Sequence, residues 1–191
     1  MIDLKGRELI LASASPRRKW LMDELGIPFS VQSKNVEEIY PDHLKAEGIP
    51  LFLSKLKADA FSIEELQNKI VLTADTIVWL DGAELQKPVD LKEARQMIRL
   101  LSGSTHEVFT AITIRTSEIA VSEFDRTEVT FRELLDSEVE HYVDNYKPLD
   151  KAGAYGIQEW IGYIGIKKIE GCYFNVMGLP LRKVYQILTT L

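Results

Sequence analysis

The most apolar run of the chain is residues 70–80, IVLTADTIVWL, and a single carboxylate, Asp75, interrupts it. The run predicts a buried central strand. A carboxylate inside such a strand must be paired, hydrogen-bonded, metal-bound or neutralised, because desolvating an isolated charge is costly. Acids in this position collect at active sites, although structural ion pairs also produce them. Asp75 is therefore a candidate functional residue, and alternation predicts that Thr76 faces the other side of the strand.

A second constraint lies in residues 9–26, LILASASPRRKWLMDELG. The apolar residues 9–11 predict a short strand, and small polar residues follow it as a turn. Pro16 is typical of the first position of a helix, with Ser15 as its N-cap. Gly26 stands where a helix commonly ends in a left-handed residue. This stretch therefore predicts a strand, a turn and a helix.

Two arginines, Arg17 and Arg18, fall in the first turn of that predicted helix. Cations at this end oppose the helix dipole by about 0.3–1 kcal/mol each. The arrangement becomes favourable when an anion binds there, because backbone N–H groups, guanidinium groups and the hydroxyls of Ser13 and Ser15 can all donate to it. The pattern predicts a phosphate site, and the alternative is that both arginines lie in solvent.

Length and composition bound the fold and its partners. With 191 residues and 46% hydrophobic content, we expect one domain, residues 1–191, around one core. The net charge of −6 argues against binding of polymeric nucleic acid and leaves room for a small phosphorylated ligand. No apolar stretch long enough for a membrane span occurs, and the first residues do not resemble a signal peptide. Cys172 is the only cysteine, which excludes an intrachain disulfide and suits the reducing cytoplasm.

Periodicity outlines the remaining elements. Helical spacing predicts helices from about Pro50 with Phe52 on the buried side, from an Asp90–Glu93 capping box to Gly103, over 137–145, and at the C-terminal end. Alternation predicts strands at 28–32, 107–115, 120–122, 128–132, 163–169 and 173–176.

Other candidate residues have two interpretations each. Glu38 follows Glu37 in a predicted loop and is either solvated or available to a metal ion or a water molecule. Lys57 lies beside the apolar stripe of its helix and is either exposed or functional. The glycines of the loop at 148–158 allow close approach of a ligand, or simply make turns. No Ser/Cys–His–Asp pattern supports a covalent nucleophile, and His106 is expected to be structural.

Seven segments, taken together and in order, resemble the Maf nucleotide pyrophosphatases. They are SASPRR (13–18), Lys57-Ala58, ADT (74–76), KP (87–88), LSGSTHEVFT (101–110), DKAGAYGIQ (150–158) and GCYFNVMGLP (171–180). The resemblance runs almost from end to end. One departure is Gln86, where many relatives have glycine, and it concerns fine geometry only.

The resemblance implies an α/β fold with a long curved mixed sheet flanked by helices, two lobes around a cleft, and a relation to the inosine-triphosphatase fold. It implies hydrolysis of a nucleoside triphosphate between its α and β phosphates, with Mg²⁺ or Mn²⁺, by a cytoplasmic homodimer. The AGAYGIQ form of the late loop is similar to the branch acting on dTTP and UTP, and the family carries a link to septum formation. Two alternatives stay open: the same reaction on a modified purine nucleotide, and a nucleotide-sensing regulator of cell division.

The resemblance also assigns residues. Asp75 matches the proton acceptor; Arg17, Thr76 and Gln158 match positions governing substrate choice; Ser13, Arg18, Lys57 and Lys87 match the phosphate pocket; and Glu38, with Asp75, matches the metal site. The amide of Gln158 offers one acceptor and two donors. It can therefore pair with the N3–H and a carbonyl of thymine or uracil, which is our hypothesis for how the base is chosen.

Overall fold

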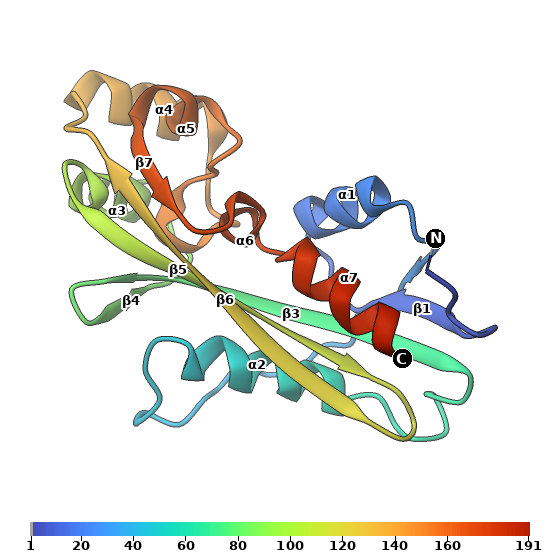
Figure 1. The fold of residues 1–191 in the computed structure, drawn as a ribbon. Helices are drawn as coiled ribbons and strands as arrows, with labels where there is room; N and C mark the ends of the chain where they lie inside the picture. Colours follow the sequence, from blue (N-terminus) through green and yellow to red (C-terminus); the bar gives the residue numbers. More distant parts are fainter. Residues whose placement is uncertain (1) are drawn as a thin grey trace. The chain divides into compact units, whose positions relative to one another are not determined.

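The structure, a computed structural model, describes residues 2–191 and divides into two compact units. The first unit contains the chain up to Asp75 together with Thr110–Asp125 and Gly178–Leu191, and the second contains Thr76–Phe109 and Arg126–Met177. Three strands run from one unit into the other: β3 (Lys69–Leu80), β5 (Thr105–Arg115) and β6 (Ala120–Phe131) (Figure 1). The single domain expected from length stays a prediction.

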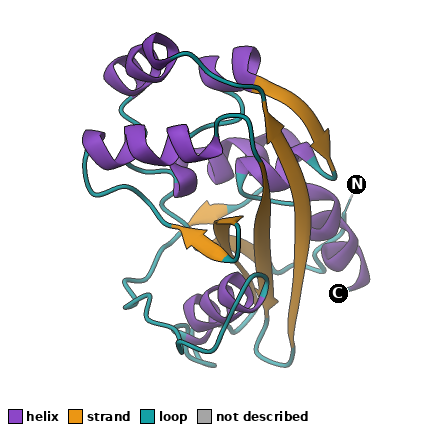
Figure 2. Cartoon of the chain, turned by 90° about the vertical axis from the view of Figure 1, so that its left-hand side faces the viewer, coloured by secondary structure: helices purple, strands orange, loops and turns teal. Residues whose placement is uncertain are grey.

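The strands form one mixed, seven-stranded sheet in the order β2-β1-β3-β5-β6-β7, with β4 paired to β3. The four remaining strands are β1 (Glu8–Leu11), β2 (Ser30–Val31), β4 (Ala83–Leu85) and β7 (Ile166–Glu170). Strand β1 is parallel to both β2 and β3, whereas the β3–β4 and β6–β7 pairs are antiparallel. Helices accompany these strands along the chain (Figure 2), so the predicted α/β class with a mixed sheet is confirmed.

Three helices cover the strands of the first unit. Helices α1 (Pro16–Leu25) and α7 (Leu181–Thr190) contact each other on one side of β1 and β3, and α2 (Gly48–Asp59) lies on the other side (Figure 1). Residues 70–75 of β3 are buried without exception. The apolar run therefore forms the central strand that its sequence predicts, and it carries Asp75 into the interior.

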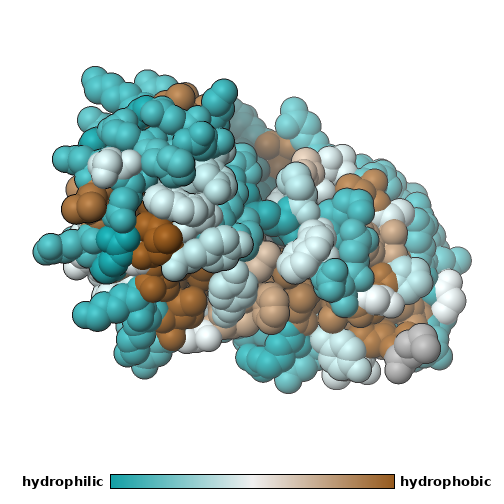
Figure 3. All heavy atoms as spheres, turned by 90° about the horizontal axis from the view of Figure 1, so that it is seen from above, coloured by the Kyte–Doolittle hydropathy of each residue, from teal (hydrophilic) through white to brown (hydrophobic). Residues whose placement is uncertain are grey.

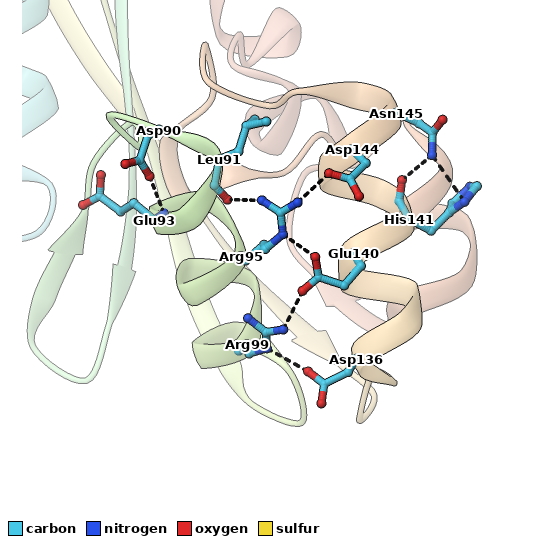
Figure 4. A network of polar contacts seen from close by, with 10 residues as sticks. All are labelled: Asp90, Leu91, Glu93, Arg95, Arg99, Asp136, Glu140, His141, Asp144 and Asn145. Carbon is cyan, nitrogen blue, oxygen red and sulfur yellow. Dashed lines mark hydrogen bonds and ion pairs between the residues drawn. The ribbon is translucent and has the colours of Figure 1, made fainter.

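In the second unit, helices α3 (Leu91–Leu101) and α4 (Asp136–Tyr146) pack against each other. Arg95 pairs with Glu140 and Asp144, and Arg99 pairs with Asp136 and Glu140 (Figure 4). Exposed ion pairs of this kind contribute little stability individually. The apolar stripe of α3 is buried instead: Ala94, Met97, Ile98 and Leu101. Burial of this stripe holds the helix in place, and the ion pairs connect the exposed sides of the two helices.

The cap of α3 differs in one detail from the predicted capping box. Asp90 Oδ1 accepts the backbone N–H of Glu93 at 2.7 Å, as expected. The carboxylate of Glu93, however, accepts the N–H of Val89 at 2.6 Å rather than that of Asp90. The reciprocal bond is therefore shifted by one residue, and both bonds still satisfy donors at the start of the helix.

Several predicted elements are wrong. Residues 173–176 form a helix, α6 (Tyr173–Met177), and the predicted strand at 163–169 is split between α5 (Trp160–Gly165) and β7. The Asn175 amide donates to Val108 O and Thr127 Oγ1, both at 2.9 Å, and these distant acceptors override the local strand pattern. The two strands predicted at 120–122 and 128–132 are one strand, β6. The strand predicted at 28–32 is limited to the two residues of β2. Phe52, predicted to be on the buried side of its helix, is 37% exposed.

The surface mixes hydrophilic and hydrophobic side chains. In the face seen in Figure 3, hydrophilic atoms cover most of the area and hydrophobic groups are interspersed among them. Large apolar side chains at the surface include Val89 and Tyr163. None of the helices within residues 2–191 combines the length and hydropathy required to cross a membrane.

His106 is part of the buried core of the second unit. It is 1% exposed, its Nε2 lies 2.7 Å from the hydroxyl of Tyr155, and its ring stacks near Phe131. Within residues 2–191, its buried Nδ1 has no hydrogen-bond partner. Burial lowers the pKa of His106 to about 4. The structural role expected for this residue agrees with its position.

This lowered pKa predicts a pH-dependent stability. Between pH 6.5 and 4, His106 is protonated in the unfolded chain and neutral in the folded chain. The free energy of unfolding should therefore fall as pH drops through this range. The full loss is about 3 kcal/mol, from about 1.36 kcal/mol per pH unit. Urea unfolding of the wild type and of His106→Gln, at pH 7 and pH 4.5, should show a smaller loss in the variant. Equal losses would contradict the buried, neutral imidazole.

Candidate functional site

The turn between β1 and α1 has the local structure that its sequence predicts. The Ser15 hydroxyl caps the helix by accepting the backbone N–H of Arg18 at 3.4 Å, with Pro16 at the first helical position. The Ser13 hydroxyl accepts the N–H of Ser15 at 3.2 Å. Gly26 ends the helix with a left-handed φ of 70°. The first turn contains two arginines and no acidic residue, so it stays a positively charged end.

The Arg18 guanidinium joins three segments of the first unit. Its Nε donates to the Gly178 carbonyl and its Nη1 to the Ala74 carbonyl, both at 2.8 Å. Nη1 also lies 3.4 Å from Ser13 Oγ. Burial lowers the pKa of Arg18, and the charge of Asp75 opposes that effect. Arg18 therefore donates N–H groups to backbone carbonyls, one of them next to Asp75. An arginine that only bound phosphate would keep these donors for its ligand.

The carboxylates of Asp75 and Glu38 both contact the ammonium group of Lys57. The Lys57 ammonium is 2.6 Å from Asp75 Oδ1 and 3.1 Å from Glu38 Oε1. Asp75 is only 7% exposed, and burial raises its pKa, whereas Lys57 and then Arg18 act to lower it. The expectation that this acid has a partner is confirmed, and the partner is Lys57 on α2.

The first unit thus gathers five of the predicted site residues around Asp75: Ser13, Arg18, Glu38, Lys57 and Asp75 itself. Arg17 is half-buried, and its charge acts on Arg18. The remaining three belong to the second unit, where Thr76 is half-buried, Lys87 is exposed and Gln158 is half-buried. Their roles stay predictions.

The two carboxylates also bear on the predicted metal ion. Across residues 2–191 no group of three or more His, Cys, Asp or Glu side chains is arranged to hold a metal. Glu38 and Asp75 nevertheless direct one oxygen each at the same cationic group, Lys57 Nζ. Mg²⁺ in nucleotide enzymes is held by one or two carboxylates, with phosphate oxygens and water as its other ligands. Two converging carboxylates therefore fit such an ion.

The glycines of the late loop serve the protein's own packing. Gly153 has φ 65°, and a Cβ there would lie 3.0 Å from the Val78 side chain. A Cβ on Gly156 would lie 2.7 Å from Cδ of Glu159. Of the two interpretations, close approach of a ligand or a turn, the structure shows tight packing against neighbouring side chains.

Sequence reasoning assigned no role in holding this loop to three residues: Tyr142, Lys151 and Glu159. Tyr142 falls at helical spacing among the buried residues of α4, Val139 and Val143, but its hydroxyl donates to the carboxylate of Glu159. Lys151 is 8% exposed and lies 3.1 Å from the same carboxylate. The only available signal was the density of polar residues among glycines in this loop.

The chemistry of the first unit is that of a base surrounded by cations. A buried carboxylate that is held by a lysine can accept a proton from water. Arginine and lysine side chains nearby can stabilise negative charge on a phosphoryl group. A carboxylate among cations is typical of one class of site: a hydrolytic site for a polyanionic ligand.

Comparison with known proteins identifies the family. The family model described as "Maf-like protein" matches residues 8–191. A dTTP/UTP pyrophosphatase of Flavobacterium johnsoniae is 50% identical over 98% of this chain and 97% of its own length. Those of Phocaeicola vulgatus (50%, over 96% and 95%) and Bacteroides fragilis (45%, over all of both chains) are similar too. The chain belongs to the Maf family.

Among solved structures, a nucleoside-triphosphatase (dITP/XTP pyrophosphatase) of Mycobacterium abscessus matches with a TM-score of 0.37. It is 14% identical and covers 66% of this chain and 75% of that one. A similarity of this size carries no conclusion about the present chain.

Proposed function

We propose that this chain hydrolyses dTTP and UTP between the α and β phosphates, releasing the nucleoside monophosphate and pyrophosphate. Membership in the Maf family supports the proposal, as do relatives of about 50% identity over nearly the full length that are named dTTP/UTP pyrophosphatases. The observation that carries it is the buried carboxylate of Asp75, 2.6 Å from Lys57 and flanked by Arg18.

In this reaction Asp75 acts as the general base. A water oxygen bonds to the α-phosphorus as its proton passes to the Asp75 carboxylate, and the bond from the α-phosphorus to the bridging oxygen breaks. Pyrophosphate leaves with that oxygen and its electron pair. The Lys57 ammonium, 2.6 Å from Asp75 Oδ1, favours the charged form of this carboxylate and so opposes the effect of burial. Arg17, Ser13 and the start of α1 bind the phosphates, and the resemblance adds Lys87 to them.

A divalent cation, Mg²⁺ or Mn²⁺, belongs to this proposal. Glu38 and Asp75, whose carboxylates both contact Lys57 Nζ, would hold it. When bound, it would neutralise part of the triphosphate charge and polarise the phosphoryl group that is attacked.

Base choice is assigned to Gln158, with Thr76 and Arg17 as the other specificity residues. The Gln158 Oε1 is buried and has no hydrogen-bond partner among residues 2–191. An unpaired buried acceptor costs about 1–3 kcal/mol. An N–H donor such as N3–H of uracil or thymine relieves this cost, whereas N3 of cytosine carries no hydrogen.

We place the reaction in the cytoplasm, where the free thiol of Cys172 is stable. The homodimer implied by the family resemblance stays a prediction, as does a link to septum formation. Sequence similarity favours the pyrimidine substrates over the modified purine alternative. The buried acid favours turnover over a purely sensing role.

A panel of triphosphates tests the proposal. Pyrophosphate release from dTTP, UTP, CTP, dATP and GTP is measured with Mg²⁺ and with excess EDTA. We expect kcat/KM for dTTP and UTP to exceed that for the other three by about 100-fold or more, since a polar site rejects mismatched hydrogen-bond partners strongly. EDTA should abolish release. A preference for a purine triphosphate, or undiminished release in EDTA, would refute the substrate or the metal part respectively.

A further inference from the structure

A buried polar network holds the loop of the second unit in which Gln158 lies. The carboxylate of Glu159 accepts a hydrogen bond from the Tyr142 hydroxyl and lies 3.1 Å from Lys151 Nζ. Tyr142 is fully buried, and Lys151 is 8% exposed. Burial raises the pKa of Tyr142, and the facing Glu159 raises it further, so the hydroxyl keeps its proton and donates a hydrogen bond to Glu159. We call these three residues the Glu159 network.

The network also holds the backbone of Gly156, two residues before Gln158. The Gly156 N–H donates to the Tyr142 hydroxyl at 3.0 Å, and the Gly156 carbonyl accepts the N–H of Glu159 at 3.0 Å. The Glu159 carboxyl group packs so closely on Gly156 that no Cβ would fit. Both polar groups of this peptide position are therefore satisfied by the network or by the residue that anchors it.

The backbone of Gln158 itself is held from the other side. Its carbonyl accepts a hydrogen bond from the hydroxyl of Tyr163, one turn into α5. Glu159, the next residue, is fixed by Tyr142 and Lys151. Gln158 thus lies between two anchored positions, while its own Oε1 is buried with no partner among residues 2–191. The described residues therefore supply no donor to this one acceptor.

We propose that Tyr142, Lys151 and Glu159 are positioning residues that set the base preference of the enzyme by fixing the loop backbone around Gln158. The inference rests on the proposed function through the role of Gln158 as the residue that pairs with the base. A single amide discriminates uracil from cytosine only while its acceptor stays in place. A loop free to shift would let the amide present its NH₂ group instead, which suits the acceptor N3 of cytosine.

A merely structural role gives a different result. Loss of general stability lowers the amount of active enzyme, and it reduces kcat/KM for every triphosphate by the same factor. Loss of positioning changes the ratio between two substrates. The ratio of kcat/KM for UTP to that for CTP therefore separates the two roles.

Tyr142→Phe removes one hydroxyl and keeps the ring. We expect the UTP/CTP ratio to fall about tenfold or more, and the Gly156 amide to exchange hydrogen with solvent faster in NMR spectra. The matched control is Tyr146→Phe: its ring stacks on Tyr142 at 5.0 Å, one turn along α4, and its hydroxyl makes no hydrogen bond within residues 2–191. Its ratio should equal that of the wild type.

Glu159→Gln keeps the shape of the side chain and removes the charge that pairs with Lys151, which keeps Asp150 as its other partner at 2.7 Å. It carries the test if Tyr142→Phe does not fold, and we expect its UTP/CTP ratio to fall in the same direction. A ratio within twofold of the wild type in the folded variants would overturn the inference. A wild-type chain that releases no pyrophosphate from UTP would instead refute the proposed function. Protection of the Gly156 amide still reports whether the network holds the loop in that case.

Discussion

Asp75→Asn should reduce pyrophosphate release from UTP by a factor of about 10³ or more. General base catalysis contributes about 10²–10⁴-fold, and an amide cannot accept the proton of water. The substitution keeps the size of the side chain at a position that is 7% exposed, and Lys57 retains Glu38 as a partner. The fold should therefore survive, with an unchanged far-UV circular dichroism spectrum.

The Asp75 carboxylate also affects stability. Burial raises the folded-state pKa of Asp75 above its unfolded value. The unfolded chain therefore loses the Asp75 proton at a lower pH than the folded chain does. The free energy of unfolding falls as pH rises from the unfolded-state pKa to the folded-state pKa of Asp75. A neutral amide escapes this loss, and the unfolding temperature of Asp75→Asn at pH 7 should not fall by more than a few degrees. Asp23→Asn, on the exposed face of α1, is the control for activity. Near-normal turnover of a folded Asp75→Asn would remove this acid from the mechanism.

Arg18→Met should destabilise the protein by about 3 kcal/mol. The guanidinium donates to the carbonyls of Ala74 and Gly178, both in buried residues, and an unpaired buried acceptor costs about 1–3 kcal/mol. Urea unfolding at pH 7 measures the loss. Catalysis should fall as well, because the Ala74 carbonyl adjoins Asp75.

Arg17→Met separates the two neighbouring arginines. Arg17 is assigned to the phosphates, so its loss should lower kcat/KM for UTP about 10–100-fold, the range of a charge-assisted hydrogen bond of about 1.5–3 kcal/mol. Its effect on the free energy of unfolding should be clearly smaller than that of Arg18→Met. Equal destabilisation by both substitutions would contradict the division of roles between them.

Local chemistry explains why the first strand, turn and helix could be predicted. The Ser15 cap, Pro16 and Gly26 act over a few residues, so their sequence is sufficient. Residues 173–176 show the opposite case. Their aromatic and β-branched side chains favour a strand, but the acceptors of Asn175 are 67 and 48 residues away in sequence, and they hold the segment as a helix.

The candidate site divides in the same way. Burial and the chemistry of an isolated charge predicted that Asp75 has a partner, but the identity of Lys57 as that partner depends on how α2 packs. The direction of the Arg18 guanidinium could not be predicted, because its carbonyl acceptors lie 56 and 160 residues away. The Glu159 network was hidden for a similar reason: Tyr142 fits an apolar helical stripe, and only the folded loop gives its hydroxyl a function.

The identity of the products tests the central claim most directly. A ³¹P NMR spectrum of UTP incubated with the wild-type protein and Mg²⁺ resolves every phosphorus-containing product. Hydrolysis at the α-phosphorus, with Asp75 as the base, predicts signals of UMP and pyrophosphate in equal amounts. Signals of UDP and orthophosphate, or an unchanged UTP spectrum, would contradict it.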